Sequence, residues 1–401
     1  MTQVSSSTGD NGSGGAHEFY QSRQVVEQYE TGRSDRIFVA DLPRLLAVGR
    51  HYGFAEQLPL YAIFDWIYGD RLRRISDDVL HGRILDLGCG TSYFYRALIT
   101  GGWRGTVCGI DVSPAMITEG SRRLRHLRAW KAPRTSADRG QYRFRDALGR
   151  TALGVVPPLD LVNADSVDHL LQNRTVGDAE RLPPDVYATV TSFSGPFCFY
   201  QRDRQRSMVL QACDRASHAV SLQFKNAGFH AMNKSGTAVA AIAAIADHVL
   251  RNTIEDSYAY LRSIGFRPPA ITAVDGDSEI PHEVGGFAYY TTTLDDVLCW
   301  FAEAGFVPIR IGTMGFSSQT FYELITPHYA AFAGDPGRLA AFVRSVVGID
   351  EYFCSDLLLG DNLQITAVRR VVADMPAVTY RPTGTYRHGY RVERREPQSE
   401  R

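Results

Sequence analysis

The chain of 401 residues lacks several features that would place it in a specialised class. It contains no run of 18 consecutive apolar residues, so we expect no membrane-spanning helix. Its formal net charge is −1, and its basic residues form no stripe along the sequence. This charge balance gives no electrostatic reason to expect nucleic acid or an anionic membrane as a partner.

Cysteine patterns typical of metal or disulfide frameworks are also absent. Six cysteines are present, but no two form a C-x-x-C pair and none has zinc-finger spacing to histidine. The sequence therefore predicts no metal site. A disulfide framework is not expected in a chain of this size, which favours a reducing, cytoplasmic location. The first residues also lack the basic start and apolar stretch of a secretory signal peptide.

The order of apolar segments predicts an α/β fold. Strands are expected at 83–87, 106–110, 160–164, 186–193 and 219–224, and helices are expected to begin near Tyr93, Pro114 and Arg202. This alternation predicts a parallel sheet with helices on its faces. A further helix and strand are expected within 293–313, and a last strand within 363–372.

Composition divides the chain into six parts. The expected parts are a disordered tail (1–16), a helical cap (17–81), the alternating core (82–225), an inserted substrate lid (226–290), the C-terminal part of the core (291–375) and a basic tail (376–401). A stretch rich in arginine, glycine and proline also separates the second and third core strands, and we interpret it as an insertion.

The clearest site signal is LDLGCGT, residues 85–91, at the end of the first predicted strand. Gly88 and Gly90 carry no Cβ, so the backbone can turn sharply there and approach a ligand closely. The following helix points its unpaired N–H groups into the same crevice. No lysine follows the turn, which excludes a P-loop. A dinucleotide fingerprint is disfavoured because its third glycine position is occupied by Tyr93.

The stretch DLGCGTSYF, residues 86–94, resembles the first motif of class I S-adenosylmethionine-dependent methyltransferases. The resemblance implies a seven-stranded, mostly parallel sheet flanked by helices, with S-adenosylmethionine as the cofactor. It also implies that Gly88, Cys89 and Gly90 cradle the methionine part of the cofactor and that Asp86 addresses its amino group. The sequence departs from the family pattern at Ser92, where a third glycine is usual.

A second motif follows in GIDVSPAMI, residues 109–117. Asp111 lies 21 residues after Gly90, and an acid about 20 residues beyond a glycine turn can accept hydrogen bonds from both ribose hydroxyls. The stretch is similar to the second motif of the same family, and Pro114 suits the first position of a helix. The resemblance implies that Val112 or Met116 packs on the adenine.

The acid expected under the adenine amino group has two candidates. If LDLVNADS is the third strand, Asp165 and the neighbouring Ser166 take this place, and every later segment has a role in the sheet. If YRFRDAL is the third strand, the residue is Asp146, but then YATVTSF has no place. We favour Asp165. Ser192 at the end of the fourth strand, with Tyr20 and Tyr29 of the helical cap, completes the predicted cofactor site.

The acceptor is expected beyond the carboxyl ends of the fourth and fifth strands. There His230 is a candidate catalytic residue, and the inserted loop adds His282 and Glu283 beside a Gly-Gly pair. The resemblance implies methyl transfer to oxygen, carbon or nitrogen. The insertions, the arginine-rich composition and the neutral charge favour a small-molecule acceptor, an aromatic or amino-acid-like intermediate of secondary metabolism. A homodimer is compatible with the sequence. Two alternatives stay open: a cofactor-binding protein with a cyclase or binding role, and methylation of protein or tRNA.

Overall fold

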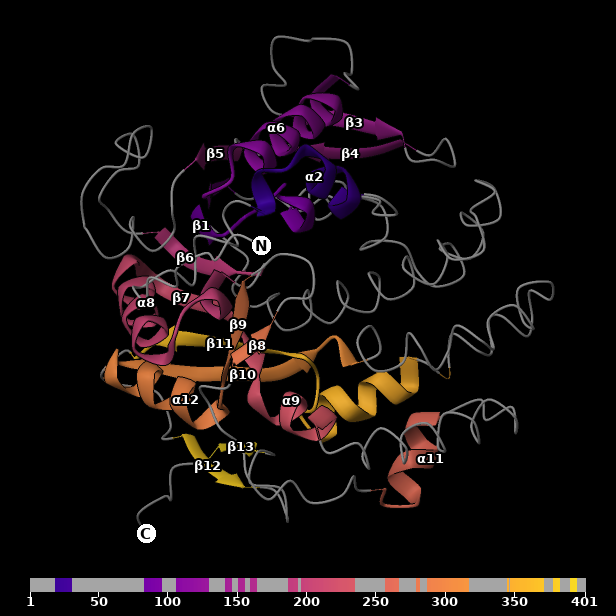
Figure 1. Cartoon of the computed structure of the whole chain (residues 1–401), viewed down its shortest axis with the longest axis vertical. Coiled ribbons are helices and arrows are strands. Elements are labelled where there is room, and N and C mark those ends of the chain that lie inside the picture. Colours follow the sequence, from indigo (N-terminus) through magenta and orange to yellow (C-terminus); the bar gives the residue numbers. More distant parts are fainter. Residues whose placement is uncertain are drawn as a thin grey trace, which may run out of the picture.

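The computed structural model describes residues 19–30, 83–95, 106–129, 141–145, 151–155, 159–163, 187–193, 196–234, 257–266, 279–281, 287–316, 345, 347–370, 378–382 and 390–394. Within these ranges a central sheet contains a path of seven strands in the order β10-β11-β7-β6-β1-β2-β5 (Figure 1). This path matches the seven-stranded, mostly parallel sheet that the resemblance implies, and two further strands beside it bring the sheet to nine.

Five of these strands are parallel neighbours, and each lies where the apolar segments predict a strand. Their bounds are β1 Arg83–Leu87, β2 Thr106–Asp111, β5 Leu159–Asn163, β6 Tyr187–Ser192 and β7 Ala216–Asn226. β5 pairs with β2 in parallel register, which confirms LDLVN as the third strand of the sheet. YRFRDAL has no place in this sheet.

The last strand of the sheet runs against the others. β11 (Asn362–Arg369) is antiparallel both to β7 and to β10 (Phe306–Met314), so β10 is parallel to the first five strands. An antiparallel strand begins at the edge where its parallel neighbours end. The start of β11 therefore lies beside the carboxyl end of β7, where Asn362 is opposite Lys225.

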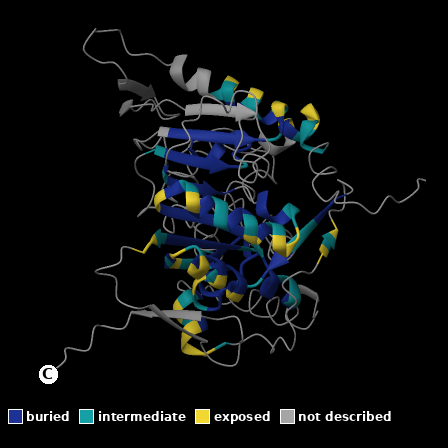
Figure 2. Ribbon diagram, turned by 90° about the vertical axis from the view of Figure 1, so that its left-hand side faces the viewer, coloured by how far each residue is buried: buried dark blue, intermediate teal, exposed yellow. Residues whose placement is uncertain are grey.

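Helices cover the sheet and turn one apolar face toward it. α8 (Arg202–Arg215) buries Gln205, Met208, Val209, Ala212 and Cys213, a spacing of three and four residues that defines one helix face. It packs beside α12 (Leu294–Glu303) and against β6 and β7. α6 (Pro114–Ala129) packs near β2 and β5 and next to α2 (Arg23–Glu30). Figure 2 shows the central strands buried, while α8 and α12 also carry exposed residues.

The described parts of the predicted lid interval contain α9 (Ala227–Lys234), α11 (Ser257–Ser263), β8 (Glu279–Pro281) and β9 (Ala288–Thr292). β9 extends the carboxyl end of β7 by pairing Thr291 with Lys225 in parallel register. Two antiparallel pairs lie outside the main sheet: β3 (Gln141–Arg145) with β4 (Thr151–Val155), and β12 (Val378–Pro382) with β13 (Tyr390–Arg394). The segment predicted as a basic tail therefore contains a β-hairpin. No helix in the described part of the chain is both long and apolar enough to cross a membrane.

Arg369 joins three elements at the opposite edge of the sheet. Its Nη2 donates hydrogen bonds to the carbonyl oxygens of Cys213 (2.9 Å) and Ala216 (2.6 Å), at the C-terminus of α8. Its guanidinium carbon also lies 5.0 Å from the ring centroid of Phe306 at the start of β10. An arginine at this place adds a cation and hydrogen-bond donors at the C-terminus of a helix, where the helix dipole is negative.

Replacement of Arg369 by methionine is expected to lower the free energy of unfolding by about 1–3 kcal/mol, because charge-assisted hydrogen bonds to helix carbonyls are lost. Arg370→Met is the matched control, since Arg370 is exposed and its backbone N–H, not its side chain, is bonded to Gly305. The control should change stability by less than about 0.5 kcal/mol. Urea denaturation measures both variants, and equal effects would contradict the role of Arg369.

Candidate functional site

The glycine turn after β1 has a backbone conformation that favours glycine. Gly88 and Gly90 have φ values of 65° and 53°. At Gly88 a Cβ would also lie 2.8 Å from the Pro196 side chain, so the turn needs glycine both for its conformation and for its close packing. At Gly90 a Cβ would meet no atom within 4 Å, so open space lies beside the turn. A ligand can therefore approach the backbone there.

Ser92 occupies a position where the backbone again favours glycine. Its φ is 57°, and its side chain is buried. The resemblance places the third glycine of the family motif here, and the structure gives the physical reason for that glycine. The backbone N–H of Ser92 donates to the carbonyl oxygen of Cys89 at 2.8 Å, which closes the turn.

Asp111 at the end of β2 connects the glycine turn with the helix that follows. Its Oδ2 accepts a hydrogen bond from the Gly90 backbone N–H, and its Oδ1 accepts one from the Ser113 N–H, both at 2.8 Å. Ser113 then caps α6, since its Oγ accepts from the Met116 N–H at 3.2 Å. An ionised carboxylate has about four acceptor positions, so it can accept more than two hydrogen bonds.

Asp86 in β1 is buried, and a hydroxyl pair holds its carboxyl group. Thr191 Oγ1 donates to Asp86 Oδ1 at 2.9 Å, and the Tyr95 hydroxyl lies 2.7 Å from the same Thr191 oxygen. Burial raises the pKa of Asp86 to about 8, although the Thr191 hydrogen bond opposes the shift; the charge of Asp111 adds to it. Asp86 is thus suited to a cationic ligand group, which would restore its charge.

The residues present fit the cofactor that the resemblance implies. Two carboxyl groups, Asp86 and Asp111, flank a turn with open space beside Gly90. Ser192 at the end of β6 adds a fully buried hydroxyl oxygen with no hydrogen-bond partner among the described residues. A ligand with an ammonium group and a pair of hydroxyls would engage both carboxyl groups. The family assigns these two roles to the same residues.

An aromatic cluster connects the N-terminal segment with the start of β9. It contains Phe19, Tyr20, Phe199, Phe287 and Tyr289, with centroid distances between neighbouring rings of 5.1–6.3 Å. The carbonyl oxygen of Tyr20 also accepts a hydrogen bond from Ser113 Oγ at 2.6 Å, next to Asp111. Segments far apart in the sequence thus meet beside the predicted cofactor site.

The predicted site residues divide into three groups. Asp86, Gly88, Cys89, Gly90, Asp111, Met116 and Ser192 lie in or shortly after β1, β2 and β6, at one edge of the sheet; Val112 is half-buried there and Met116 is buried. Tyr20 lies in the aromatic cluster, and His230 contacts Asp361. Asp146, Asp165, Ser166, His282 and Glu283 lie outside the described residues, and Tyr29 lies in α2 without a described side chain.

Sequence reasoning missed Thr191, Tyr95, Lys225 and Asp361. For Thr191 a signal was available, because it is a polar residue at the carboxyl end of the buried strand β6, opposite Asp86. Tyr95 lies in the helical segment after the glycine turn, where its sequence neighbours give no such signal. Lys225 and Asp361 are 136 residues apart and no local pattern joins them. Only the antiparallel entry of β11 beside β7 brings them together.

Comparison with known proteins gives one family match. The family model described as a methyltransferase domain matches residues 84–174, which include the glycine turn, Asp111 and β5. None of the curated proteins matches this chain. Strand order, glycine turn and family model agree that the chain carries a methyltransferase domain of class I fold, an enzyme domain, as the two motifs predict. S-adenosylmethionine is the cofactor of this class.

Several solved structures match this chain with low scores. Magnesium protoporphyrin IX methyltransferase from Synechocystis PCC 6803 is 12% identical, with a TM-score of 0.39 over 91% of this chain and 100% of that chain. The cyclopropane synthase MmaA2 from Mycobacterium tuberculosis is 11% identical, with a TM-score of 0.36 over 75% of this chain and 83% of that chain. The [4+2]-cyclase SpnF is 13% identical, with a TM-score of 0.34 over 76% and 80%. Identities and scores this low say nothing about the reaction of this chain.

Asp111→Ala is expected to weaken binding of S-adenosylhomocysteine about 30- to 1000-fold, because two charge-assisted hydrogen bonds to ribose hydroxyls are lost. It should also lower the free energy of unfolding by about 1–3 kcal/mol, since the Gly90 and Ser113 N–H groups lose their acceptor. Asp111→Asn keeps one acceptor oxygen and should lose less stability. Calorimetric titration and denaturation separate the effects, and an unchanged dissociation constant would refute the assignment.

The raised pKa of Asp86 predicts that cofactor binding depends on pH. A bound ammonium group favours the carboxylate, so binding near neutral pH should release the proton of Asp86. Affinity for S-adenosylhomocysteine should therefore rise with pH, by up to about tenfold per unit, and level off above about pH 8. Calorimetric titration in two buffers of different ionisation enthalpy gives the number of protons released when the ligand binds.

Asp86→Asn is the control for this pH dependence, since the amino group of the ligand also titrates and only the protein's contribution disappears in the variant. Thr191→Val removes the hydrogen bond to the carboxylate and should shift the rise in affinity to higher pH. The same slope in wild type and Asp86→Asn would show that Asp86 does not exchange the proton.

Proposed function

We propose that this chain transfers a methyl group from S-adenosylmethionine to a small-molecule acceptor, an aromatic or amino-acid-like compound. The observation that carries the proposal is that the carboxyl groups of Asp86 and Asp111 lie on either side of a glycine turn with open space beside it. The match of residues 84–174 to a methyltransferase domain supports it. When bound, the cofactor supplies an electrophilic methyl group.

The protein's own residues would bind and orient the two reactants. In this proposal Asp111 accepts hydrogen bonds from the ribose, Asp86 pairs with the amino group, and Met116 packs on the adenine. Asp165 would face the adenine amino group, because it follows the third strand of the sheet closely. Holding donor and acceptor in line can supply about 7–11 kcal/mol of the lowering of the barrier.

The aromatic side chains around the carboxyl ends of β6 and β7 support the proposed class of acceptor. The aromatic cluster lies there, with Phe199 just after β6 and Tyr289 in β9. Flat rings pack favourably against such side chains. This environment suits an aromatic acceptor better than an acceptor that carries many charged groups. A place in secondary metabolism, the cytoplasmic location and a homodimer remain part of the proposal.

S-adenosylhomocysteine should raise the melting temperature, because a ligand that binds only the folded protein stabilises it by about 2.7 kcal/mol at a concentration 100 times its Kd. NAD and ATP are the controls and should not. Incubation with methyl-labelled S-adenosylmethionine and a panel of phenols, amines and amino acids, read by product mass, then tests transfer. Equal stabilisation by NAD would refute the cofactor, while binding without any labelled product favours a cyclase or binding role.

A further inference from the structure

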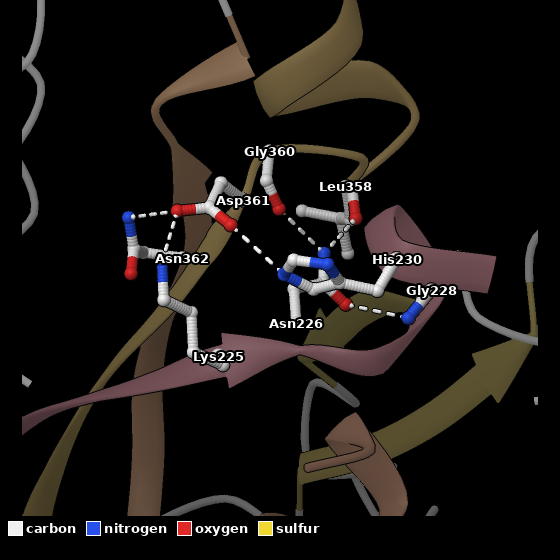
Figure 3. A network of polar contacts seen from close by, with 8 residues as sticks. All are labelled: Lys225, Asn226, Gly228, His230, Leu358, Gly360, Asp361 and Asn362. Atoms are coloured by element: carbon white, nitrogen blue, oxygen red, sulfur yellow. Dashed lines mark hydrogen bonds and ion pairs between the residues drawn. The ribbon is translucent and has the colours of Figure 1, made fainter. Parts of the chain in front are cut away.

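A charged group of three side chains lies at the carboxyl end of β7. Asp361 is the residue before β11. Its Oδ2 accepts a hydrogen bond from Lys225 Nζ at 2.5 Å, and its Oδ1 lies within hydrogen-bond distance of His230 Nε2, at 2.9 Å (Figure 3). Only 2% of the Asp361 side chain is exposed, whereas 18% of the His230 side chain is. Among the described residues nothing forms a hydrogen bond with His230 Nδ1. One imidazole nitrogen is therefore held and the other is available.

The carboxylate at the centre of this group is ionised. Burial alone would raise the pKa of Asp361, but the Lys225 ammonium and the hydrogen bond with His230 outweigh it and hold this pKa at about 2. The same charge pair keeps the pKa of Lys225 above its ordinary value despite burial. An ionised Asp361 at Nε2 fixes the proton of neutral His230 on Nε2, which leaves a lone pair on Nδ1.

Neighbouring side chains hold this geometry. The Asn226 amide donates to the carbonyl oxygens of Leu358 (2.9 Å) and Gly360 (2.8 Å), and its own oxygen accepts from the Gly228 N–H (3.1 Å) (Figure 3). Leu358 has a φ of 53°, and a Cβ on Gly360 would lie 2.5 Å from the Met314 nitrogen. A strained, tightly packed turn that presents one charged residue is typical of a functional site.

The charged group lies next to the predicted site for both reactants. Lys225 Nζ is 5.2 Å from the ring centroid of Tyr289, a member of the aromatic cluster. The short helix η3 (Pro196–Phe199) packs against Gly88 at Pro196 and brings Cys198 close to Lys225 and Asp361. Burial raises the pKa of Cys198 to about 12 and also raises the pKa of Tyr289, so both stay neutral. His230 is the member of this group that has one ring nitrogen held by Asp361 and the other without a hydrogen bond among the described residues.

We propose that His230 is the general base for a phenolic acceptor and that Asp361 is its positioning residue. The inference rests on the proposed function and narrows its acceptor to an aromatic hydroxyl. The ring of the acceptor would pack on the aromatic cluster, and its hydroxyl would face His230 Nδ1. Imidazole is the side chain most often used for such proton transfer.

The proposed reaction is balanced without a further reactant. The oxygen of the acceptor forms a bond to the methyl carbon while its proton moves to His230 Nδ1. The bond between that carbon and the sulfonium sulfur breaks, and its electron pair stays on sulfur. The resulting imidazolium is stabilised by the Asp361 carboxylate, and it returns its proton to solvent after the product leaves.

The test uses 4-nitrophenol, a colourless phenol with a yellow phenolate, titrated into the full-length protein saturated with S-adenosylhomocysteine. Below the ordinary pKa of the probe, wild type should give a saturable yellow signal, because His230 accepts the proton of the bound phenol. His230→Gln should reduce this signal at least about tenfold, equivalent to one pKa unit. Asp361→Asn keeps the size of the side chain, removes its charge and should reduce the signal as well.

His218→Gln is the matched control, since His218 lies exposed in the same strand, β7, near its other end, and should leave the signal unchanged. Lys225→Met tests the competing explanation that a cation alone stabilises the phenolate. A signal lost in Lys225→Met but retained in His230→Gln would overturn the proposal, and so would the absence of a saturable signal in wild type. If wild type does not bind S-adenosylhomocysteine, the proposed function itself fails; binding without phenolate formation overturns only this inference.

Discussion

The hydrogen bond from the Gly90 backbone to the Asp111 carboxylate is the interaction on which the site depends. It joins the turn after β1 to the end of β2, while the other carboxylate oxygen orders the start of α6. The Asp111 side chain thus connects two parallel strands, a glycine turn with a left-handed backbone and the N-terminus of a helix. A Cβ on Gly90 would meet no atom within 4 Å, so the turn held by Asp111 also has open space beside it.

Two buried aspartates show how partners, rather than burial, decide the charge of a carboxyl group. Asp86 has one hydroxyl partner, Thr191, and a nearby like charge, and its pKa rises to about 8. Asp361 is just as buried but faces Lys225 and His230, and its pKa falls to about 2. The first suits a ligand that brings its own positive charge. The second supplies permanent charge to a neighbouring histidine.

Much of the fold followed from local pattern. Strand β1 has the predicted bounds, and α6 and α8 begin at the predicted Pro114 and Arg202, because apolar runs and a proline at the first helical position are local signals. The hairpin of β12 and β13 was not predicted, since its basic and aromatic residues resemble those of a solvated tail. The predicted acids under the adenine and the His282 and Glu283 pair lie outside the described residues, so those assignments stay predictions.

The sequence by itself determined the class of the protein, because two short motifs at the ends of β1 and β2 resemble those of one family. The glycine turn and the distance from Gly90 to Asp111 are visible in the sequence, and the resemblance adds the expected role of Asp86. Only the tertiary structure decided which side chains meet at the acceptor edge. Asp361 reaches Lys225 and His230 because β11 enters antiparallel between β7 and β10, and its first residues therefore lie where the parallel strands end. Strand order and direction are set by the packing of the whole sheet, and no short window of sequence contains them.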